Sequence, residues 1–576
     1  MKKRWKIAPS DKGIQEALCR ELNVLPLTAG VLINRGLVEA DKAFSFLRPE
    51  LSGLHDPFLL GDMDKACGRI VSAFEREEKI AVYGDYDVDG VTAASCLYLF
   101  FHELGVEVAP YIPRRLSEGY GLNSEAIKKL HAEGVKLIIT VDCGSSNNIE
   151  IAFANSLGVD VIITDHHEMG NLPPAFAVIN PKRKDCAFPF KGLAGVGVAF
   201  NLMMALRVIL RRQGWFETER CKNHEPNLKK YLDLVAIGTI ADMVPLVDEN
   251  RIFASCGLGE LETTCRPGLI ALKEAARVLP GRIDATTVAY RLAPRLNAAG
   301  RVGSASLAFA LLTTQDAGEA RSLADALNAE NASRQRIEEG ILHDALSMLG
   351  DGVIGKGIVL ASEGWNAGVI GIVASRLVDR YCMPVVMIAI DKDNGVGRGS
   401  ARGVKAFDLL SGLESCATQL VRFGGHKAAA GLTVRQENIG AFREEFMAHL
   451  NQVLPDSAIG HEIELDALTT LDSLDLRQAE EFGQLAPFGS CNPEPVLGAM
   501  DASILATEVV GAKHLRFRFK HNGNNIGGIG FGLADMHPMK GTGYSLAFSP
   551  YVDEWQGTRS LKLRIKDVRR FDGGRM

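Results

Sequence analysis

The chain has 576 residues, 47% of them hydrophobic and 23% charged, which predicts a globular protein of roughly two to four domains. Its first residues lead into no apolar signal segment, and no uninterrupted apolar stretch approaches transmembrane length, so we expect no membrane association. The eleven cysteines form no CxxC pair, so we expect reduced thiols, as in a cytoplasm.

The formal net charge of −6 conceals an asymmetry along the chain. Residues 513–576 contain twelve Lys and Arg and five Asp and Glu, a balance of +7, so the residues before them carry −13. A basic C-terminal region on an acidic chain indicates a polyanionic partner.

Apolar strand-like runs alternate with helical patterns from about residue 50 to about residue 245. The runs cover residues 80–83, 137–141, 161–164 and 234–240, and the helical patterns include residues 91–104 and 124–133. This alternation predicts a mainly parallel sheet covered by helices on both faces.

Potential metal ligands follow each of the four runs. They are Asp85, Asp87 and Asp89 after the first, Asp142 after the second, Asp165, His166 and His167 after the third, and Asp242 after the fourth. The carboxyl ends of parallel strands meet at one crevice, where crowded carboxylates repel one another unless a cation lies between them. Six carboxylates and two imidazoles there predict two divalent metals and hydrolysis of a phosphate ester.

Simpler interpretations exist for each motif alone. Residues from Asp85 to Gly90 match the start of a calcium-binding EF-hand loop, but the twelfth loop position is Cys96 instead of glutamate, and a strand precedes the loop. The other ligands could individually be turn, cap or structural residues. Their joint occurrence favours the metal centre. Cys221 and His224 have metal-ligand spacing without a second pair, which favours a surface loop.

The second half of the chain divides into three patterns. Residues 250–350 are mostly helical, and the proline-free stretch 317–349 predicts one long helix. A second α/β pattern follows, with strand-like runs at 358–360 and 384–389, a helical segment at 369–380, glycine-rich turns and an amphipathic stretch at 438–450. From about residue 460, short alternating strands predict a small β-barrel or sandwich.

Residues 397–403 combine glycines with Arg398, Ser400 and Arg402. Glycines let backbone N–H groups approach a phosphate, and arginine binds its oxygens bidentately, so the segment could be an anion pocket. The alternative is a flexible turn with exposed arginines.

Residues 514–520 and 561–566 alternate apolar with basic side chains, which places each basic set on one face of its strand. That face could be a nucleic-acid groove or simply a solvated surface. The basic residues are Arg516, Arg518, Lys562 and Arg564, and we expect Phe517 and Phe519, on the opposite face, in the core.

Taken together, these motifs resemble the DHH phosphoesterase superfamily and, within it, the bacterial single-strand-specific DNA exonucleases. The resemblance rests on residues 84–90, 141–144, 165–167 and 238–242, and extends through 295–301, 397–403, 423–426 and 486–489. One departure is Cys491, where the family pattern has glycine; we expect it to affect only a local turn, far from the metal motifs.

The resemblance implies an α/β fold in which a mainly parallel-sheet DHH domain and a smaller α/β DHH-associated domain are joined by a long helix, with a C-terminal OB-like β-barrel. The implied boundaries are an N-terminal segment at 1–50, the DHH domain at 51–250, a helical region and connecting helix at 251–350, the DHH-associated domain at 351–458 and the barrel at 459–576.

The resemblance also implies roles for the ligands. Asp87 and Asp89 would bind separate Mg²⁺ or Mn²⁺ ions, Asp142 would bridge them, and His166 and Asp242 would complete one site. Asp85, Asp165 and His167 would support these ligands or bind the other metal. Implied substrate-binding residues are Arg114, Arg301, Ser400, Arg402, His426, Arg516 and Arg518, with Ser400 and Arg402 holding a terminal 5′-phosphate.

The implied function is metal-dependent 5′→3′ degradation of single-stranded DNA to mononucleotides, in DNA recombination and repair, with a single-stranded-DNA-binding protein and a helicase as partners. The alternatives are a phosphoesterase for small substrates and a non-catalytic DNA-binding scaffold. The basic barrel argues against the first, and the complete ligand set argues against the second.

Overall fold

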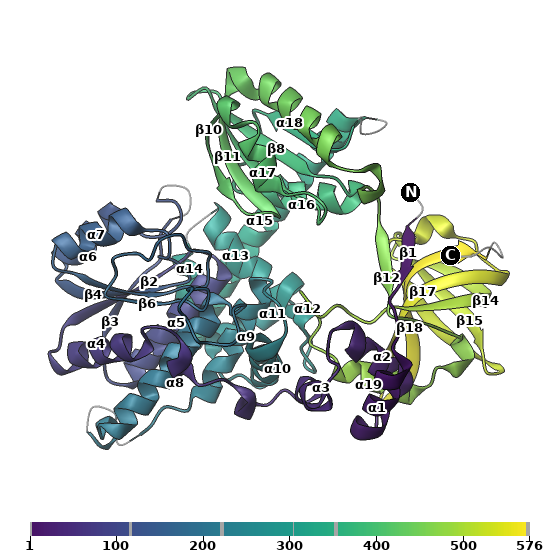
Figure 1. Cartoon of the computed structure of the whole chain (residues 1–576), viewed down its shortest axis with the longest axis horizontal. Coiled ribbons are helices and arrows are strands. Elements are labelled where there is room, and N and C mark those ends of the chain that lie inside the picture. The colour runs from purple at the N-terminus through teal and green to yellow at the C-terminus, as the bar shows by residue number, and fades with distance from the viewer. Residues whose placement is uncertain (1–2, 115–117, 219–223, 303–304, 351–354, 572–576) are drawn as a thin grey trace. The chain divides into compact units, whose positions relative to one another are not determined.

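The computed structural model describes residues 3–114, 118–218, 224–302, 305–350 and 355–571, so Cys221 lies outside the described residues. The chain divides into two compact units (Figure 1). The catalytic unit, as we call it below, contains Ile7–Asn328 and Glu464–Met576, and the second unit contains Met1–Lys6 and Ala329–Ile463. The chain passes from one to the other within helix α15, whose bounds, Ala317–Leu349, match the predicted long helix.

A five-stranded parallel sheet forms the centre of the catalytic unit. Its strands are β2 (Lys79–Gly84), β3 (Val108–Tyr111), β4 (Val135–Val141), β5 (Asp160–Thr164) and β6 (Ala177–Ile179), in the order β3-β2-β4-β5-β6. All four pairings are parallel, as the strand and helix alternation predicted.

Helices cover both faces of this sheet, because alternate residues of β2 and β4 enter two separate cores. One face packs against α4 (Met63–Glu75), α5 (Val88–Glu103) and α8 (Gly195–Arg212). The other packs against α6 (Ser124–Ala132) and α7 (Asn148–Ser156). With both faces covered, the carboxyl edge of the sheet is the part left for chemistry.

The fourth apolar run is a helix, and the strand-like prediction for it was wrong. Residues Leu232–Ala241 form α9, in which every residue from Leu232 to Ile240 is buried. A short run that is apolar on all sides fits a buried helix as well as a buried strand, and periodicity cannot separate the two. Asp242 therefore follows a helix that packs against α5 and α8.

Helices continue from α9 to α15. They are α10 (Asp248–Glu262), α11 (Pro267–Ala275), α12 (Ala285–Thr287), a π-helical turn (Val288–Leu292), α13 (Ala293–Val302) and α14 (Ser306–Thr313). This confirms the mostly helical pattern predicted for residues 250–350.

The C-terminal part of the catalytic unit is a closed barrel. The strands are β14 (Leu497–Val510), β15 (His514–His521), β16 (Asn524–Gly530), β17 (Gly541–Trp555) and β18 (Thr558–Arg570); β14 pairs with both β15 and β17 and so closes the ring. Short β13 (Ala467–Thr469) adds to β14, and helix α19 (Leu476–Gln484) precedes the barrel. Three of these strands are long, with 13 to 15 residues, where short strands were predicted.

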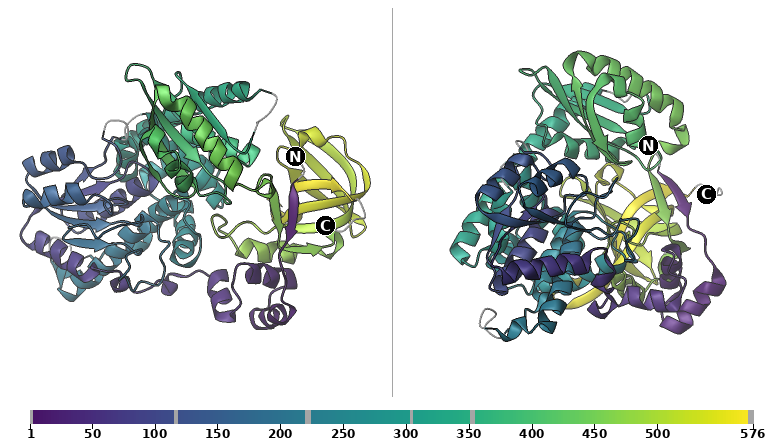
Figure 2. Two further views of the ribbon diagram at one scale, coloured as in Figure 1. Left: turned by 45° about the horizontal axis from the view of Figure 1, so that its top comes forward. Right: turned by 60° about the vertical axis from the view of Figure 1, so that its left-hand side comes forward.

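Three N-terminal helices share their hydrophobic core with this barrel (Figure 2). They are α1 (Lys12–Leu22), α2 (Pro26–Asn34) and α3 (Ala40–Leu47). Buried Leu32 and Phe46 belong to the same cluster as Phe517 and Phe519, which are 1% and 0% exposed. The prediction that these two phenylalanines face the core is confirmed.

The second unit contains a mixed sheet in the order β10-β11-β9-β8-β7. Its strands are β7 (Ile358–Ser362), β8 (Val385–Asp391), β9 (Val396–Arg402), β10 (Leu420–Gly425) and β11 (Ala429–Arg435). Helix α16 (Ile370–Tyr381) and the end of α15 cover one face, and α17 (Leu409–Glu414) and α18 (Ile439–Val453) cover the other. Residues 397–402, predicted as glycine-rich turns, belong to strand β9, in which Gly397 and Gly399 leave room for Ile388 and Leu432.

None of the described helices combines the length and apolar character needed to cross a bilayer.

Candidate metal centre and phosphate site

The loop after β2 carries three of the candidate ligands, Asp85, Asp87 and Asp89. Asp87 caps α5 and accepts a hydrogen bond from the Gly90 N–H at 3.1 Å. A Cβ atom at Gly90 would lie 2.6 Å from the backbone nitrogen of Asp85, so only glycine lets the loop fold back this tightly. The turn places carboxylates of one short segment around the N-terminus of one helix, where the helix dipole favours negative charge.

Asp89 is fixed by a second helix N-terminus. Its Oδ2 and Oδ1 atoms accept hydrogen bonds from the Gly195 and Val196 N–H groups of α8, at 2.6 and 2.9 Å. Burial, followed by repulsion from Asp87, nevertheless raises the pKa of Asp89 to about 7. The carboxylate is thus held in place while its negative charge remains poorly compensated.

Asp142 follows β4 with a backbone φ of 60°, a left-handed conformation that aspartate and asparagine tolerate better than most residues. Its N–H donates to the Thr164 carbonyl at 2.9 Å. The Cα of Gly195 approaches so closely that a Cβ there would lie 2.7 Å from Asp142 Oδ1. Burial, followed by the charges of Asp89 and Asp87, raises the pKa of Asp142 well above its usual range.

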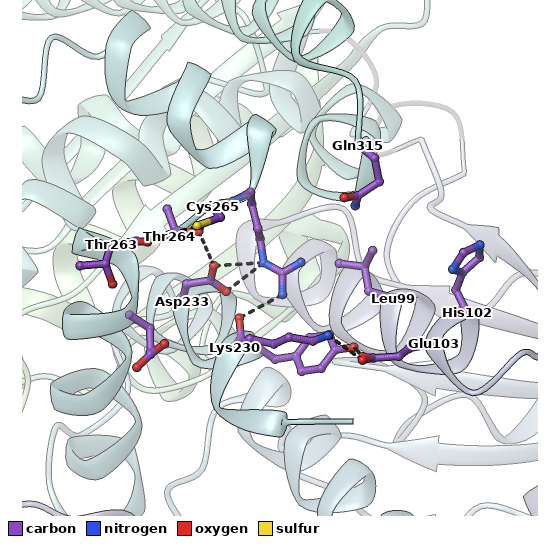
Figure 3. Close-up of a pocket in the computed structure, with 12 residues that line it drawn as sticks. Leu99, His102, Glu103, Lys230, Asp233, Thr263, Thr264, Cys265 and Gln315 are labelled. Atoms are coloured by element: carbon purple, nitrogen blue, oxygen red, sulfur yellow. Dashed lines mark hydrogen bonds and ion pairs between the residues drawn. The ribbon is translucent and has the colours of Figure 1, made fainter. Parts of the chain in front are cut away.

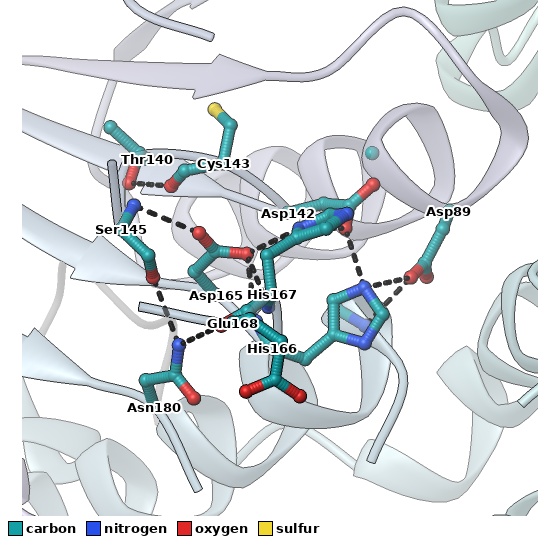
Figure 4. Close-up of polar contacts among 12 residues, drawn as sticks. Asp89, Thr140, Asp142, Cys143, Ser145, Asp165, His166, His167, Glu168 and Asn180 are labelled. Carbon is teal, nitrogen blue, oxygen red and sulfur yellow. Dashed lines mark hydrogen bonds and ion pairs between the residues drawn. The ribbon is translucent and has the colours of Figure 1, made fainter. Parts of the chain in front are cut away.

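Three carboxylates lie around the side chain of His166, which follows β5, and Figure 4 shows two of them, Asp142 and Asp89. The His166 Nε2 atom lies 3.1 Å from Asp142 Oδ1, 3.6 Å from Asp242 Oδ2 and 3.9 Å from Asp89 Oδ2. Burial lowers the pKa of His166 to about 4, so its imidazole is neutral at neutral pH. Burial and then the charge of Asp89 raise the pKa of Asp242.

Two buried atoms at the centre of this group have no hydrogen-bond partner among the described residues: Asp142 Oδ1 and His166 Nε2. Buried polar atoms without partners are rare, and a lone pair on each would be satisfied by one cation. Three sets of ligand atoms lie within 4.8 Å of one another, namely Asp89–His166–Asp242, Asp142–His166–His167 and Asp85–Asp87–Asp142. Carboxylate oxygens are the donors that Mg²⁺ and Mn²⁺ prefer, and imidazole is a common ligand of transition-metal ions, so these residues would fit two divalent cations.

Asp165 and His167 form a supporting layer beside these ligands (Figure 4). Asp165 accepts hydrogen bonds from the Ser145 N–H at 2.9 Å and from the His166 N–H at 2.7 Å, and it contacts His167 Nδ1 at 2.8 Å. Although burial alone would raise it, these bonds and the neighbouring imidazole hold the pKa of Asp165 below its usual range. His167 also lies 3.0 Å from the hydroxyl of Tyr120.

Several residues that shape the site were missed from the sequence. Gly195 and Val196 at the start of α8, and Ser145, act through their backbone N–H groups, which no side-chain pattern reveals. Asn297 accepts a hydrogen bond from the Val88 N–H at 3.2 Å, and Gly300 packs against the Tyr86 carbonyl. Both lie in the motif 295–301, which was noted, although only Arg301 was assigned a role.

In the second unit, the N-terminus of α16 lies beside two predicted phosphate ligands. Arg402 donates to the Ser400 hydroxyl at 3.0 Å, and a Cβ at Gly371 of α16 would lie 2.7 Å from that hydroxyl and 2.9 Å from the guanidinium. Ser400 and Arg402 are half-buried. A serine hydroxyl, an arginine fork and a helix N-terminus within contact distance are the donors an anion requires.

The remaining predicted substrate ligands lie at three different elements. Arg114 is exposed directly after β3, and Arg301 is partly buried on α13. His426 is exposed between β10 and β11, where its Nδ1 accepts from the Ala428 N–H at 3.3 Å.

The basic residues of the barrel are exposed on β15 or half-buried on β18. Arg516 pairs with Glu508 at 3.1 Å, Lys562 pairs with Asp553, and Arg564 pairs with Glu494. Arg518 forms no ion pair with any described residue. Its charge, like that of exposed Lys520 on the same face, is available to a polyanion.

A separate pocket of about 540 Å³ lies at the C-terminal end of α5 (Figure 3). Its charged side chains already pair with each other: Arg266 with Asp233 at 3.0 Å, and Lys230 with Glu103 at 2.7 Å. The candidate metal ligands are absent from the residues that line it. The chemistry therefore belongs to the edge of the sheet.

A parallel sheet with this ligand set at its carboxyl edge defines a phosphoesterase of the DHH class, and the DHH family N-terminal domain matches residues 79–239. The DHHA1 domain matches residues 354–452, and the RecJ OB domain matches residues 465–567. The chain belongs to the RecJ family.

Relatives support this over nearly the whole chain. The single-stranded-DNA-specific exonuclease RecJ of Bacillus subtilis is 37% identical over 98% of this chain and 71% of its own length. The Escherichia coli protein of the same name is 36% identical over 94% of this chain and 96% of its own. The crystal structure of RecJ from Thermus thermophilus in complex with Mn²⁺ superimposes with a TM-score of 0.82 at 31% identity, covering 98% of this chain and 79% of that one.

Proposed function

We propose that this protein is a metal-dependent exonuclease that degrades single-stranded DNA to mononucleotides from the 5′ end, in DNA recombination and repair. The observation that carries the proposal is the convergence of Asp89, Asp142 and Asp242 on His166 Nε2, within 3.1 to 3.9 Å. The relatives named as single-stranded-DNA-specific exonucleases, one of them solved with Mn²⁺ and again with Mg²⁺, support the substrate and the cations.

The chain's own residues divide the work of hydrolysis. Asp87, Asp89, Asp142, His166 and Asp242 would hold two divalent cations, with Asp85 and His167 completing the shell. Bound cations of this kind activate water and stabilise charge on the phosphate oxygens during an in-line displacement. Asp165 orients His167 through its 2.8 Å contact, and the α8 N-terminus keeps Asp89 in place. A nucleophilic side chain is then not required.

We further propose that Ser400, Arg402 and His426, together with Arg114 and Arg301, bind the 5′-terminal part of the strand, and that Arg516 and Arg518 bind more distant phosphates. The α16 N-terminus beside Ser400 and Arg402 supports the terminal phosphate site. The ten described cysteines are free thiols, which supports a cytoplasmic location, where a single-stranded-DNA-binding protein and a helicase would be partners.

The first test is digestion of single-stranded and double-stranded DNA, labelled at either end, with Mn²⁺, with Mg²⁺ and with EDTA. We expect mononucleotides from the 5′ end of single strands in the presence of either metal. Equal cleavage of duplex DNA, release from the 3′ end or full activity in EDTA would contradict the proposal.

The phosphate site is tested by the ratio of rates on 5′-phosphorylated and 5′-hydroxyl strands. Arg402→Ala should reduce this ratio at least about tenfold, because a charge-assisted bidentate contact is lost. Arg435→Ala, at the end of β11 in the same sheet, is the matched control and should leave the ratio unchanged. If Arg402→Ala keeps the wild-type ratio of rates on 5′-phosphorylated and 5′-hydroxyl strands, Arg402 does not bind the 5′-phosphate.

A further inference from the structure

The loop that follows Asp242 is held by a loop of the C-terminal barrel region. The Leu246 N–H donates to the Ser490 carbonyl at 2.9 Å. A Cβ atom at Gly489 would lie 2.7 Å from Leu246 Cδ1, and Leu246 is buried. Both loops belong to the catalytic unit, although some 240 residues separate them in sequence.

Only three residues separate Asp242 from Leu246. Asp242 is fixed on its other side by α9, where its N–H donates to the Gly238 carbonyl at 2.9 Å. Met243 between them has a φ of 60°, so this short connection bends sharply. Because so few backbone dihedral angles lie between the two residues, a displacement of Leu246 should also move the carboxylate of Asp242.

Asn250 connects the same loop to the segment before α8, whose first N–H groups hold Asp89. Its buried side-chain amide donates to the Pro245 carbonyl at 3.0 Å and to the Gly192 carbonyl at 2.6 Å. Gly192 lies three residues before Gly195, whose N–H holds Asp89. One side chain therefore links the segments that position two metal ligands.

The next residue, Arg251, clamps α10 to the barrel loop. Its guanidinium is 1% exposed and donates to the carbonyls of Phe46, Gln484, Leu485 and Ala486 at 2.8 to 3.2 Å. Burial lowers the pKa of Arg251 to about 9. Arg251 donates to four carbonyls and, among the described residues, to no carboxylate. Its role is therefore to hold α10 against residues 484–486.

Hydrogen bonds also hold the barrel loop, residues 486–492, in place. The Asn492 amide donates to the Leu485 and Pro487 carbonyls at 2.8 Å each, and its Oδ1 accepts from Arg35 Nε at 2.7 Å. Cys491 has a φ of 57°, the left-handed conformation that favours the glycine of the family pattern. Ser490, the residue before this departure, contacts Leu246 in the loop after Asp242, beyond the metal motif at 238–242, and the expectation of a purely local effect stays a prediction.

We propose that residues 486–492 act as a positioning element for the metal centre: Gly489 and Ser490 set the position of Leu246, and through it that of the ligand Asp242. The inference rests on the proposed metal-dependent function and assigns the barrel region a role besides strand binding. Metal affinity should then depend on a contact made outside the DHH domain.

The test is direct titration of the full-length protein with Mn²⁺, following free Mn²⁺ by electron paramagnetic resonance. Gly489→Val should weaken Mn²⁺ binding at least about tenfold, the lower end of the effect of removing support from metal ligands. Gly483→Val on α19, where a Cβ would meet nothing within 4 Å, is the matched control and should bind Mn²⁺ like the wild type. Thermal midpoint and single-strand affinity in EDTA should be alike in the two variants.

A compensating change makes the assignment specific. Adding Leu246→Ala to Gly489→Val removes the clash and should recover at least about threefold of the lost affinity. If Gly489→Val lowers the thermal midpoint by more than about 5 °C, Gly489→Ala is titrated in its place.

Wild-type Mn²⁺ affinity in the Gly489 variant, or no recovery in the double variant, would overturn the inference. Absence of Mn²⁺ binding by the unaltered protein would instead overturn the proposed function, so the two failures are distinguishable.

Discussion

Asp142, like His166, belongs to two of the three ligand sets, and its Oδ1 lies 3.1 Å from His166 Nε2. Its left-handed backbone restricts what can replace it. Asparagine tolerates this conformation and has the same shape, so Asp142→Asn isolates the loss of charge from any change of the turn.

We expect Asp142→Asn to reduce cleavage of single-stranded DNA at least about a hundredfold, because a shared ligand is lost. Affinity for single-stranded DNA in EDTA should stay within about threefold of the wild type, since a buried carboxylate contributes little to strand binding. Gel-based digestion and fluorescence anisotropy measure the two quantities. Turnover at the wild-type rate would exclude the bridging role.

The carboxylates of the metal centre also predict an unusual pH dependence of stability, which the same variant tests. Folding raises the pKa of Asp142, Asp89 and Asp242, so the native metal-free protein binds more protons than the unfolded chain above about pH 4, and its stability falls as pH rises. The pKa of His166, lowered to about 4, has the opposite effect on stability. This opposing contribution is also present in Asp142→Asn, because the variant retains His166.

In EDTA at pH 8, Asp142→Asn should therefore be more stable than the wild type by at least about 1 kcal/mol, or roughly 1 °C. The difference should shrink as pH falls towards 5, and Mn²⁺ should reverse its sign. Calorimetry across this range checks the trend; a variant less stable than the wild type in EDTA at pH 8 would argue against crowded, uncompensated carboxylates.

At the residue scale, the side chains expected at the metal centre do lie close together, and their roles as metal ligands stay a prediction. Asp85, Asp87, Asp89, Asp142, His166, His167 and Asp242 all contribute atoms to the ligand sets. The sequence could not predict Gly195, because the need for a missing Cβ arises only when α8 reaches Asp142 in the folded chain.

Among the elements, the start of α8 leaves no room for a side chain beside Asp142. Gly195→Ala would place a methyl group 2.7 Å from Asp142 Oδ1, so either the helix or the ligand must move. We expect Mn²⁺ affinity to fall at least about tenfold. Gly68→Ala in α4, where nothing lies within 4 Å, is the control and should be neutral or slightly stabilising. Isothermal titration calorimetry with Mn²⁺ compares them; equal affinities would show that the approach is looser than described.

Element types were predicted where a pattern had one solution. The three strands at 80–83, 137–141 and 161–164 are short apolar runs followed by polar turns, and each is a strand. Residues 234–240 look the same in sequence but form α9, because helices surround that segment on every side. The position of Asp242 was nevertheless predicted correctly, since a ligand at the end of either element can reach the site.

In the whole molecule, Arg251 connects α10, α3 and the segment before the barrel. Arg251→Met should lower the free energy of unfolding by at least about 2 kcal/mol, because buried carbonyls lose their donor. Arg212→Met, at the exposed end of α8, controls for the loss of an arginine. Urea denaturation followed by circular dichroism measures both, and similar midpoints for the two variants would count against the clamp.

Contacts of this kind, between residues far apart in the sequence, cannot be predicted from local sequence patterns. The predicted OB-like barrel is present, but its shared core with α1, α2 and α3 was not predicted, because a hydrophobic helix face does not specify its partner. Arg251 likewise carries no local signal of its four carbonyl acceptors.

The shared core of the N-terminal helices and the barrel bears on how the protein is made. Helices α1–α3 leave the ribosome long before residues 471–568, which contribute the barrel side chains of the same core, are translated. At synthesis rates of about 5–20 residues per second, the apolar side chains of these helices wait roughly 20–90 s for their partners. Residues 329–463 form a nearly continuous unit and can fold during that interval. Until then the apolar side chains of α1–α3 lack these partners, and a chaperone that shields this segment would raise the yield of folded protein.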